Sequence, residues 1–486
     1  MQSAVGFDNS YARLPERFFA RLNPKPVREP TLIKLNEKLA DELGMDKDFL
    51  ASQSGVAALA GNSNLEGSDP LAMAYAGQQF GNWVPQLGDG RALLLGEVID
   101  KQGIRRDIQL KGSGPTPFSR MGDGRAWLGP VLREYVVSEA MHALGVPTTR
   151  ALAAVSTGEP VVREEVLPGA ILTRVSKAHI RVGTFQYFAA RRDDEGIRQL
   201  ADYAIDRLYP GQKESENPYL ALLNCVIEAQ AKLVAQWMNL GFIHGVMNTD
   251  NVSIAGETID YGPCAFMDEF HPDRVFSSID QHGRYAYSNQ PRIAHWNLVQ
   301  FAQAILPLLG EDEKLAVEQA QLAINAFPNL YQTAYQTGFN AKLGLVELQE
   351  GDADLGNDLL KLMAEQKVDF TLAFRHLCNE DLGPFNALFE NQDDVDIWLE
   401  RWQKRLEDGD NSAADGHALM LKANPALIPR NHRIEQAIRA ALEDDFEPFH
   451  RLCRVLERPF EEQEDAADLM LPPQPKEVVP YTFCGT

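Results

Sequence analysis

The sequence predicts an α+β fold in which a β-rich part precedes a mainly helical part. Between residues 88 and 176, apolar and polar residues alternate in short runs separated by glycine-containing turns, which is typical of strands. From about residue 183 the pattern becomes mainly helical and stays so to about residue 470. The chain has 486 residues, more than a single core usually supports, so we expect two or three packed units.

The first predicted elements are a helix and a pair of strands. The helix is expected over residues 31–43, because Gly44 supplies a stop signal. Residues 91–98 and 106–111 have the composition of strands, and the string DKQG between them, at 100–103, is typical of a turn. A β-hairpin is therefore predicted.

A second helix and further short strands follow this hairpin. The helix is predicted over residues 128–144, where Gly145 and Pro147 stop it. Three short β-rich segments come after the helix. They are residues 150–156, 160–165 and 170–176.

The helical part of the chain opens with a strong helix predicted near residues 220–240. Residues 252–254 and 258–259 are interpreted as a tiny hairpin around a glycine turn. Residues 291–470 are expected to be helical and rich in acidic side chains, and the tail after Pro472 begins with a proline-rich stretch.

This order of elements is that of a two-lobed protein kinase with additions at both ends. A strand pair, a helix and more strands would form the N-terminal lobe, and a long helix followed by a loop would begin the C-terminal lobe. We expect an N-terminal extension, a β-rich N-lobe, a C-lobe, a helical C-terminal region and a tail. Their predicted ranges are 1–80, 81–182, 183–310, 311–470 and 471–486.

Composition excludes several classes of partner. The formal net charge is -23, whereas non-specific binding to nucleic acid or to an anionic membrane needs a basic surface. No run of about 18 apolar residues exists, and the N-terminus lacks a secretory pattern. The five cysteines form no C-x-x-C pair, so a structural zinc site is not expected and a reducing compartment is. We therefore expect a cytoplasmic protein without nucleic-acid or membrane partners.

Two strings near the middle of the chain carry the chemistry. HGVMNTDN at 244–251 and DYG at 260–262 align with the kinase catalytic loop H-R-D-x-x-x-x-N and with the metal-binding D-F-G. Asn251 and Asp260 would bind Mg²⁺ through oxygen, with Mn²⁺ as a possible substitute. Val246 occupies the place of the kinase base, and Asp250 is the nearest carboxylate that could replace it. The alternative for Asp250 is a turn cap.

Lys111 ends a predicted strand at the place where a kinase holds its nucleotide lysine. A strand-end lysine is more often simply solvated, but the downstream strings favour the nucleotide role. The expected ion-pair partner lies on the helix at 128–144. Glu139 falls on the apolar face of that helix by periodicity, whereas the family likeness described below favours Glu134. Either could instead be a surface charge.

Two further features suit an anion. The string GDGRA occurs at 88–92 and again at 122–126, and glycine turns can present backbone N–H groups to phosphate. Each could also be an ordinary turn. A basic cluster lies at the end of the last predicted strand, and its contrast with the acidic chain favours an anion site over a solvated surface run. Its members are Arg174, Lys177, His179 and Arg181.

Together these segments resemble the selenoprotein O family over nearly the whole chain. The matching strings are GDGR at 88–91, QLKGSG at 109–114, RA at 125–126, REY at 133–135, HGVMNTDN at 244–251 and DYGP at 260–263. Members are pseudokinases that bind ATP in a reversed orientation and transfer AMP, not phosphate, to protein hydroxyls. The resemblance implies a protein adenylyltransferase acting on Ser, Thr or Tyr of protein substrates, with pyrophosphate as the other product and a link to redox stress.

The resemblance also implies roles for individual residues. Asp250 would be the base, Asn251 and Asp260 would hold the metal, and Asp260 would also face ATP. Glu134 would pair with Lys111. The remaining nucleotide contacts implied by the resemblance come from glycines, cations and an aspartate. They are Gly88, Gly90, Arg91, Lys111, Asp123, Gly124, Arg174 and Arg181.

The C-terminal string ends in Cys484, where some members of the family carry selenocysteine. Cys264 follows the DYG string, so we hypothesise a reversible Cys264–Cys484 disulfide that holds the tail near the site. The alternative is two free thiols. The sequence leaves two rival functions open: a protein or small-molecule kinase with a displaced base, and a non-catalytic ATP-binding scaffold.

Overall fold

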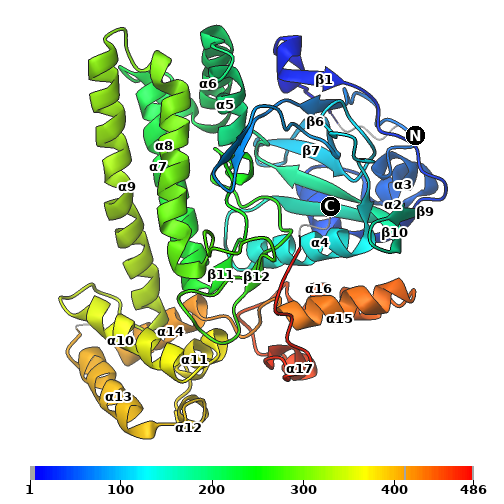
Figure 1. The fold of residues 1–486 in the computed structure, drawn as a ribbon. Helices are drawn as coiled ribbons and strands as arrows, with labels where there is room; N and C mark the ends of the chain where they lie inside the picture. Colours follow the sequence, from blue (N-terminus) through cyan, green and yellow to red (C-terminus); the bar gives the residue numbers. More distant parts are fainter. Residues whose placement is uncertain (1–5, 410–411, 484–486) are drawn as a thin grey trace.

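The computed structural model describes residues 6–409 and 412–483. Figure 1 shows a β-rich part on one side of the molecule, long helices on the other, and a further group of helices below them. The structure combines helices with an antiparallel sheet, and the C-terminal part is helical, so the predicted α+β class is confirmed. No helix in the described ranges is both long and apolar enough to cross a membrane.

An antiparallel sheet dominates the β-rich part. Within the described residues it has eight strands in the order β1-β3-β6-β7-β10-β9-β2, and β8 pairs with β10. Strands before residue 81 belong to the same sheet as those after it; the predicted domain boundaries remain predictions. The bounds are β1 (Phe19–Arg21), β2 (Thr31–Leu35), β3 (Leu71–Met73), β6 (Ala92–Ile99), β7 (Arg105–Lys111), β8 (Ala126–Trp127), β9 (Arg150–Val162) and β10 (Val166–Ser176).

Helix α4 (Leu128–Ala143) lies against this sheet and is buried along most of its length. Its packing on one side comes from β9 and β10, and on the other from α15 (Asn431–Leu442) and α16 (Glu447–Val455). Tyr135 of α4 meets Phe449 of α16 edge to face, with ring centroids 5.7 Å apart. A helix covered on two sides by apolar contacts has little freedom to shift.

The second lobe is built around α7 (Pro218–Asn239), α8 (Gln290–Ile305) and α9 (Glu313–Lys342), which run side by side in Figure 1. Asn217 caps α7 by accepting the backbone N–H of Leu220, and Pro218 at the first helical position lacks the N–H that would be unsatisfied there. Helices α5 (Val182–Ala189) and α6 (Asp194–Leu208) complete the lobe.

The remaining elements are short or lie late in the chain. Between the strands of the first lobe lie α1 (Glu37–Glu42), α2 (Lys47–Ala51), α3 (Gln53–Leu59) and the hairpin β4 (Gly77–Gln79) with β5 (Asn82–Val84). The strands β11 (Phe242–Ile243) and β12 (Ala265–Phe266) pair in the second lobe. The late helices are α10 (Asp352–Glu365), α11 (Phe370–His376), α12 (Gly383–Asn386), α13 (Gln392–Glu407), α14 (Ala413–Ala423) and α17 (Ala467–Met470).

The predicted helix over 31–43 is half wrong. Its first part is strand β2, which pairs with β9 from Thr31 opposite Ser156 onward, and only its second part is helix α1. Asn36 separates the two, because its side chain accepts the backbone N–H of Leu39 and caps the helix. Pairing with a strand over a hundred residues away decided the conformation of the first part.

The short strands are also corrected. The three predicted segments between 150 and 176 form one long hairpin of β9 and β10, and its turn falls inside the predicted segment 160–165. The tiny hairpin expected at 252–259 does not form. Ser253 bridges Arg181 and Thr258 bridges Thr148, so these two segments pair with other parts of the chain and not with each other.

Candidate active site

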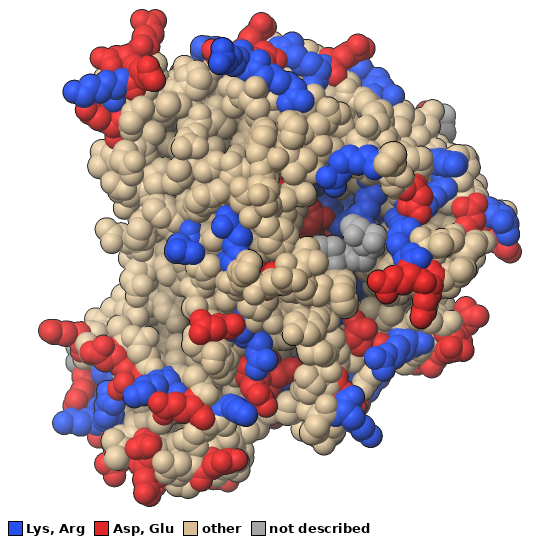
Figure 2. All heavy atoms as spheres, in the orientation of Figure 1, with Lys and Arg blue, Asp and Glu red and all other residues tan. Residues whose placement is uncertain are grey.

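A cavity of about 910 Å³ opens between the sheet and the helical lobe. Figure 2 shows Lys and Arg side chains gathered around the hollow on this face. All the residues to which the family resemblance assigned nucleotide or metal contacts line the cavity, together with the expected base. They are Gly88, Gly90, Arg91, Lys111, Asp123, Gly124, Arg174, Arg181, Asp250, Asn251 and Asp260.

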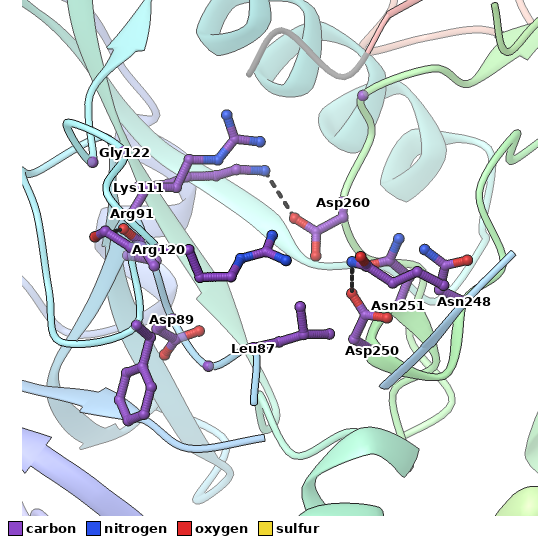
Figure 3. A pocket seen from close by; sticks show the side chains of 18 of the residues that line it. Leu87, Asp89, Arg91, Lys111, Arg120, Gly122, Asn248, Asp250, Asn251 and Asp260 are labelled. Carbon is purple, nitrogen blue, oxygen red and sulfur yellow. Dashed lines mark hydrogen bonds and ion pairs between the residues drawn. The ribbon is translucent and has the colours of Figure 1, made fainter. Parts of the chain in front are cut away.

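Lys111 reaches into the cavity from the end of β7 and makes two ion pairs. Its Nζ lies 2.6 Å from Oε2 of Glu134 and 2.8 Å from Oδ1 of Asp260. Figure 3 shows the second of these contacts across the cleft. Glu139, the alternative partner, lies elsewhere and accepts from Arg150 at 2.8 Å. Lys111 therefore joins the sheet, α4 and the segment that carries Asp260.

Arg174, on β10 beside Lys111 in the sheet, is buried and binds the same two carboxylates. Its Nη2 donates to Asp260 Oδ1 at 2.7 Å, and its Nε donates to Glu134 Oε1 at 2.8 Å. Burial would lower the pKa of this guanidinium, but Asp260 and Glu134 outweigh burial and raise it. Burial likewise opposes ionisation of Asp260, yet Arg174, Lys111 and Arg181 hold its pKa well below the usual range. Asp260 is thus an anion among cations.

Arg181 lies at the start of α5 and contacts the other side of the site. Its Nη1 donates to the backbone carbonyl of Asp250 at 2.9 Å and lies 3.5 Å from Asp260 Oδ2. Its guanidinium also lies over the ring of Tyr75, 4.5 Å from the centroid, and 3.8 Å from Oδ1 of the buried Asp89. Arg181 therefore links the loop that carries Asp250 to the first glycine string.

Asp250 belongs to a short 3-10 helix, Thr249–Asn251, and its side chain is buried. Oδ2 accepts from Gln79 Nε2 at 3.4 Å, whereas Oδ1 has no hydrogen-bond partner among the described residues. Burial raises the pKa of Asp250 to about 6, although Arg181 and Gln79 act in the opposite direction. A carboxylate with this pKa and an unpaired oxygen can accept a proton near neutral pH.

Neighbouring asparagines fix the loop around Asp250. Asn248 Oδ1 accepts the backbone N–H of Phe80 at 2.9 Å and the hydroxyl of Tyr285 at 2.6 Å. Asn251 Nδ2 donates to the carbonyl of Val246 at 3.0 Å, which leaves its carbonyl oxygen as the acceptor end. His244 is buried and its Nε2 contacts the carbonyl of Ile259, so it supports the loop and lies off the cavity.

The oxygen atoms of Asn251 and Asp260 suit a hard cation. Within residues 6–409 and 412–483, no group of three or more His, Cys, Asp or Glu side chains could hold a metal by itself. Mg²⁺ does not need such a group, because it commonly takes one or two protein oxygens and completes its shell with phosphate and water. The donor set present therefore fits Mg²⁺ bound together with a phosphate-bearing ligand.

The two glycine strings come together through the segment between β7 and β8. A Cβ at Gly88 would lie 2.3 Å from the ring of Phe118, and a Cβ at Gly124 would lie 2.1 Å from the backbone of Gly114. Both glycines also have positive φ, so a side chain at either position would be strained. Asp123 points to Arg163, 2.8 Å away, at the rim of the cavity.

The basic cluster of the sequence divides into two pairs. Arg174 and Arg181 line the cavity, but Lys177 and His179 do not. His179 follows the end of β10 and is buried against Asp107, whose Oδ2 accepts the His179 backbone N–H at 2.8 Å and lies 2.9 Å from Nδ1. The sequence suggested that these four residues form one anion site. The structure corrects this, because only two of them line the cavity.

Sequence reasoning missed several residues of the site. Gln79, which contacts Asp250, lies in a hairpin far from the catalytic-type loop and carries no motif. Asp89 is buried inside the first GDGR string, accepting from the backbone of Met73 and from Gln109. The GDGR string could have pointed to Asp89 as a site residue. Nothing in the sequence points to Gln79, which only the tertiary structure brings to the site.

Part of the tail contacts the segment after the DYG string. Thr482 N–H donates to the carbonyl of Phe276 at 2.8 Å, and Thr482 Oγ1 donates to the carbonyl of Pro263 at 2.5 Å. Cys264, next to Pro263, is buried. Cys484 lies outside the described residues, so the hypothesised disulfide stays a prediction.

Known proteins resemble this chain along its whole length. The family model "Protein adenylyltransferase SelO" matches residues 2–457. A protein of Methylorubrum populi named "Protein nucleotidyltransferase YdiU" is 59% identical, and the similarity covers all of both chains. Proteins of the same name from a Bradyrhizobium species and from Rhizobium etli are each 58% identical, covering 99% and 100% of this chain and 99% and 98% of their own length.

Proposed function

The chain belongs to the SelO family of protein adenylyltransferases, and from this we propose that its cleft binds ATP and transfers AMP to hydroxyl groups of proteins. The observation that carries the proposal is the geometry around Asp250. A buried carboxylate with an unpaired oxygen lies beside the oxygen donors Asn251 and Asp260, across a cavity lined by cations. This arrangement offers a proton acceptor, a metal site and a phosphate site in one cleft.

Cations around Asp260 support phosphate binding. Lys111, Arg174 and Arg181 converge on one carboxylate from three different elements. When ATP enters, its phosphate oxygens can take over some of these contacts, because guanidinium and ammonium groups bind phosphate as readily as carboxylate. Asn251 and Asp260 would hold Mg²⁺ or Mn²⁺, which when bound draws charge from the phosphate oxygens.

The transfer follows from where proton and charge must go. Asp250 Oδ1 accepts the proton of a Ser, Thr or Tyr hydroxyl while the hydroxyl oxygen attacks the α-phosphorus of ATP. The bond from the α-phosphorus to the bridging oxygen breaks, and its electron pair leaves with pyrophosphate. The cations of the cleft offset the charge on that leaving group. The reversed orientation of ATP that exposes the α-phosphorus is an expectation of the family resemblance.

The partners proposed are ATP and protein substrates with accessible hydroxyls. Nucleic acid is not expected, because a net charge of -23 opposes it. The proposed link to redox stress rests on the tail, since Thr482 contacts Pro263 next to Cys264. The cytoplasmic location stays a prediction from the sequence.

The proposal is tested with ATP labelled separately at the α- and γ-phosphates. Purified protein with Mg²⁺ is expected to transfer α-label and no γ-label to itself and to a generic protein acceptor. Asp260→Ala, which removes a metal oxygen and the anion at the centre of the cations, is expected to abolish transfer. Transfer of γ-label alone would identify a kinase. Retained ATP binding without transfer of either label would identify a scaffold.

A further inference from the structure

A tight turn at the mouth of the cleft is held in an unusual backbone conformation. Gly122 N–H donates to the carbonyl of Ser119 at 2.7 Å, and both residues between them have positive φ: +49° at Arg120 and +71° at Met121. Two-residue turns of this kind favour glycine, asparagine or aspartate, because other side chains are strained there. Such strain persists only where the surroundings impose it, and it occurs mostly at functional sites.

The surroundings of this turn do impose it. Ser119 Oγ donates to the carbonyl of Gly90, and Thr116 Oγ1 donates to the carbonyl of Asp89 at 2.7 Å. The ring of Phe118 packs directly on Gly88, where a Cβ would come within 2.3 Å. The turn is thus fixed to the first glycine string, which forms part of the cleft wall, and this contact sets the orientation of the turn.

The strained turn directs Arg120 into the cavity. Figure 3 shows its side chain extending into the cleft, with the guanidinium pointing toward the side where Asp260 and Asp250 lie. Within the described residues Arg120 forms no hydrogen bond or ion pair. The other cations near it are engaged: Lys111 and Arg174 with Glu134 and Asp260, and Arg163 with Asp123. Arg120 is therefore a cation that points toward the reaction site and is available to bind a ligand.

We propose that Arg120 is a further catalytic residue, which donates its guanidinium N–H groups to the pyrophosphate as it leaves the α-phosphorus. This inference rests on the proposed function. The α-phosphorus must lie between Asp250, which takes the proton, and the oxygen donors Asn251 and Asp260, and Arg120 points into this space from the opposite wall. A guanidinium at this place can donate to two oxygens of pyrophosphate at once and keeps its own proton.

Steady-state kinetics with α-labelled ATP tests the role. Arg120→Ala is expected to lower kcat about 10²- to 10³-fold with a much smaller change in the KM for ATP, because the charge that it offsets develops in the transition state. Arg120→Lys is expected to recover part of the loss, since an ammonium keeps the charge but not the paired geometry. Met121→Ala, in the same turn, serves as the control and is expected to stay within twofold of the wild type.

A stability measurement separates this role from a structural one. Glycine adopts positive φ without strain, so Arg120→Gly is expected to keep or raise the melting temperature while kcat falls as in Arg120→Ala. A residue that merely held the loop would lower the melting temperature on substitution. The proposal is overturned if Arg120→Ala keeps kcat within about threefold, or if only its KM changes.

Titration with inorganic pyrophosphate and Mg²⁺ distinguishes failure of this inference from failure of the proposed function. Arg120→Ala is expected to weaken pyrophosphate binding at least tenfold, and Met121→Ala to leave it unchanged. If the wild type transfers no α-label but this difference in binding holds, the proposed function is wrong and the pyrophosphate contact stands. Equal binding of pyrophosphate by the wild type and Arg120→Ala contradicts the contact itself.

Discussion

Asp250 has a protonation state that burial controls, and this gives the reaction a pH dependence. Burial raises its pKa from an ordinary value of 3.8 to about 6. A base acts only when deprotonated, so kcat/KM is expected to rise tenfold per pH unit below about pH 6 and to level off above it. A profile that is flat between pH 5 and 7 would exclude Asp250 as the base.

The same shift predicts how Asp250 affects stability. A folded-state pKa above the unfolded one means that the folded protein holds its proton more tightly, so stability falls as pH rises from about 4 to 6 and stays lower above. Asp250→Asn removes this effect and is expected to gain on the order of 2 kcal/mol over the wild type between pH 4 and 7. Unfolding by urea at both pH values measures the difference. A constant difference across that range would contradict the shift.

Gly77 lies close to the side chain of the proposed base. A Cβ there would lie 2.6 Å from Asp250 Oδ1 and 2.9 Å from the side chain of Leu87. Gly77→Ala is expected to displace the carboxylate and lower kcat about 10²-fold, because displacements near 1 Å have effects of this size on well-placed groups. Gly211→Ala, where a Cβ would meet nothing within 4 Å, is the control. Full activity of Gly77→Ala would show that the position of Asp250 does not matter.

Among single residues, the sequence motifs predicted much of the site but missed some of the residues that complete it. Lys111, Asn251 and Asp260 stand in strings whose order along the chain is enough to suggest their roles. Gln79 and Arg120 do not. Gln79 ends strand β4 and Arg120 lies in a tight turn, and both reach the cleft only because these segments pack against distant parts of the chain. The local sequence does not indicate that either side chain reaches the cleft.

Among the elements, those with local signals were predicted and those that depend on distant pairing were not. The strands β6 and β7, the helix α4 and the helix α7 have clear periodicity and stop signals, and the structure confirms them. Strand β2 follows from pairing with β9, and the segments at 253 and 258 follow from bridges to Arg181 and Thr148. Pairing with a distant strand outweighs local propensity in such cases.

Contacts with the late helix α15 help to hold α4 in place, and we therefore expect a substitution at these contacts to affect ATP binding at a distance. Arg133 of α4 donates to the carbonyl of Cys264 at 3.2 Å and lies 2.9 Å from Oε1 of Glu435 on α15. The next residue on α4 is Glu134, the partner of Lys111. Arg133→Met is expected to lower the free energy of unfolding by roughly 1–3 kcal/mol, because buried acceptors lose a charged donor.

The kinetic effect expected of Arg133→Met is a higher KM for ATP, because α4 would lose contacts with Cys264 and Glu435 that help to position Glu134 beside Lys111. Arg439→Met, on the exposed side of α15, provides the control and is expected to change neither stability nor KM. Calorimetry of ATP binding together with urea unfolding gives both quantities. If Arg133→Met loses stability but binds ATP like the wild type, the contacts between α4 and α15 do not influence ATP binding.

Considered as a whole, the molecule brings segments more than 200 residues apart to one side of the cleft. Thr482 bonds to Pro263, so the chain beyond it starts close to Cys264. Cys484 lies outside the described residues, two positions after Thr482, so its disulfide with Cys264 stays a prediction. Peptide mapping without reduction, after mild oxidation, is expected to find the two cysteines linked. Recovery of both thiols unlinked would end this idea.

The bond between Arg133 and Asn431 joins residues 298 positions apart in the sequence. A ribosome releases the chain from its N-terminus, so the sheet, α4 and the catalytic-type loop emerge long before α15 can reach them. During that interval α4 lacks the contacts of Arg133 with Asn431 and Glu435, which help to position the helix in the finished protein. Nascent chains are therefore expected to bind ATP only after α15 has emerged.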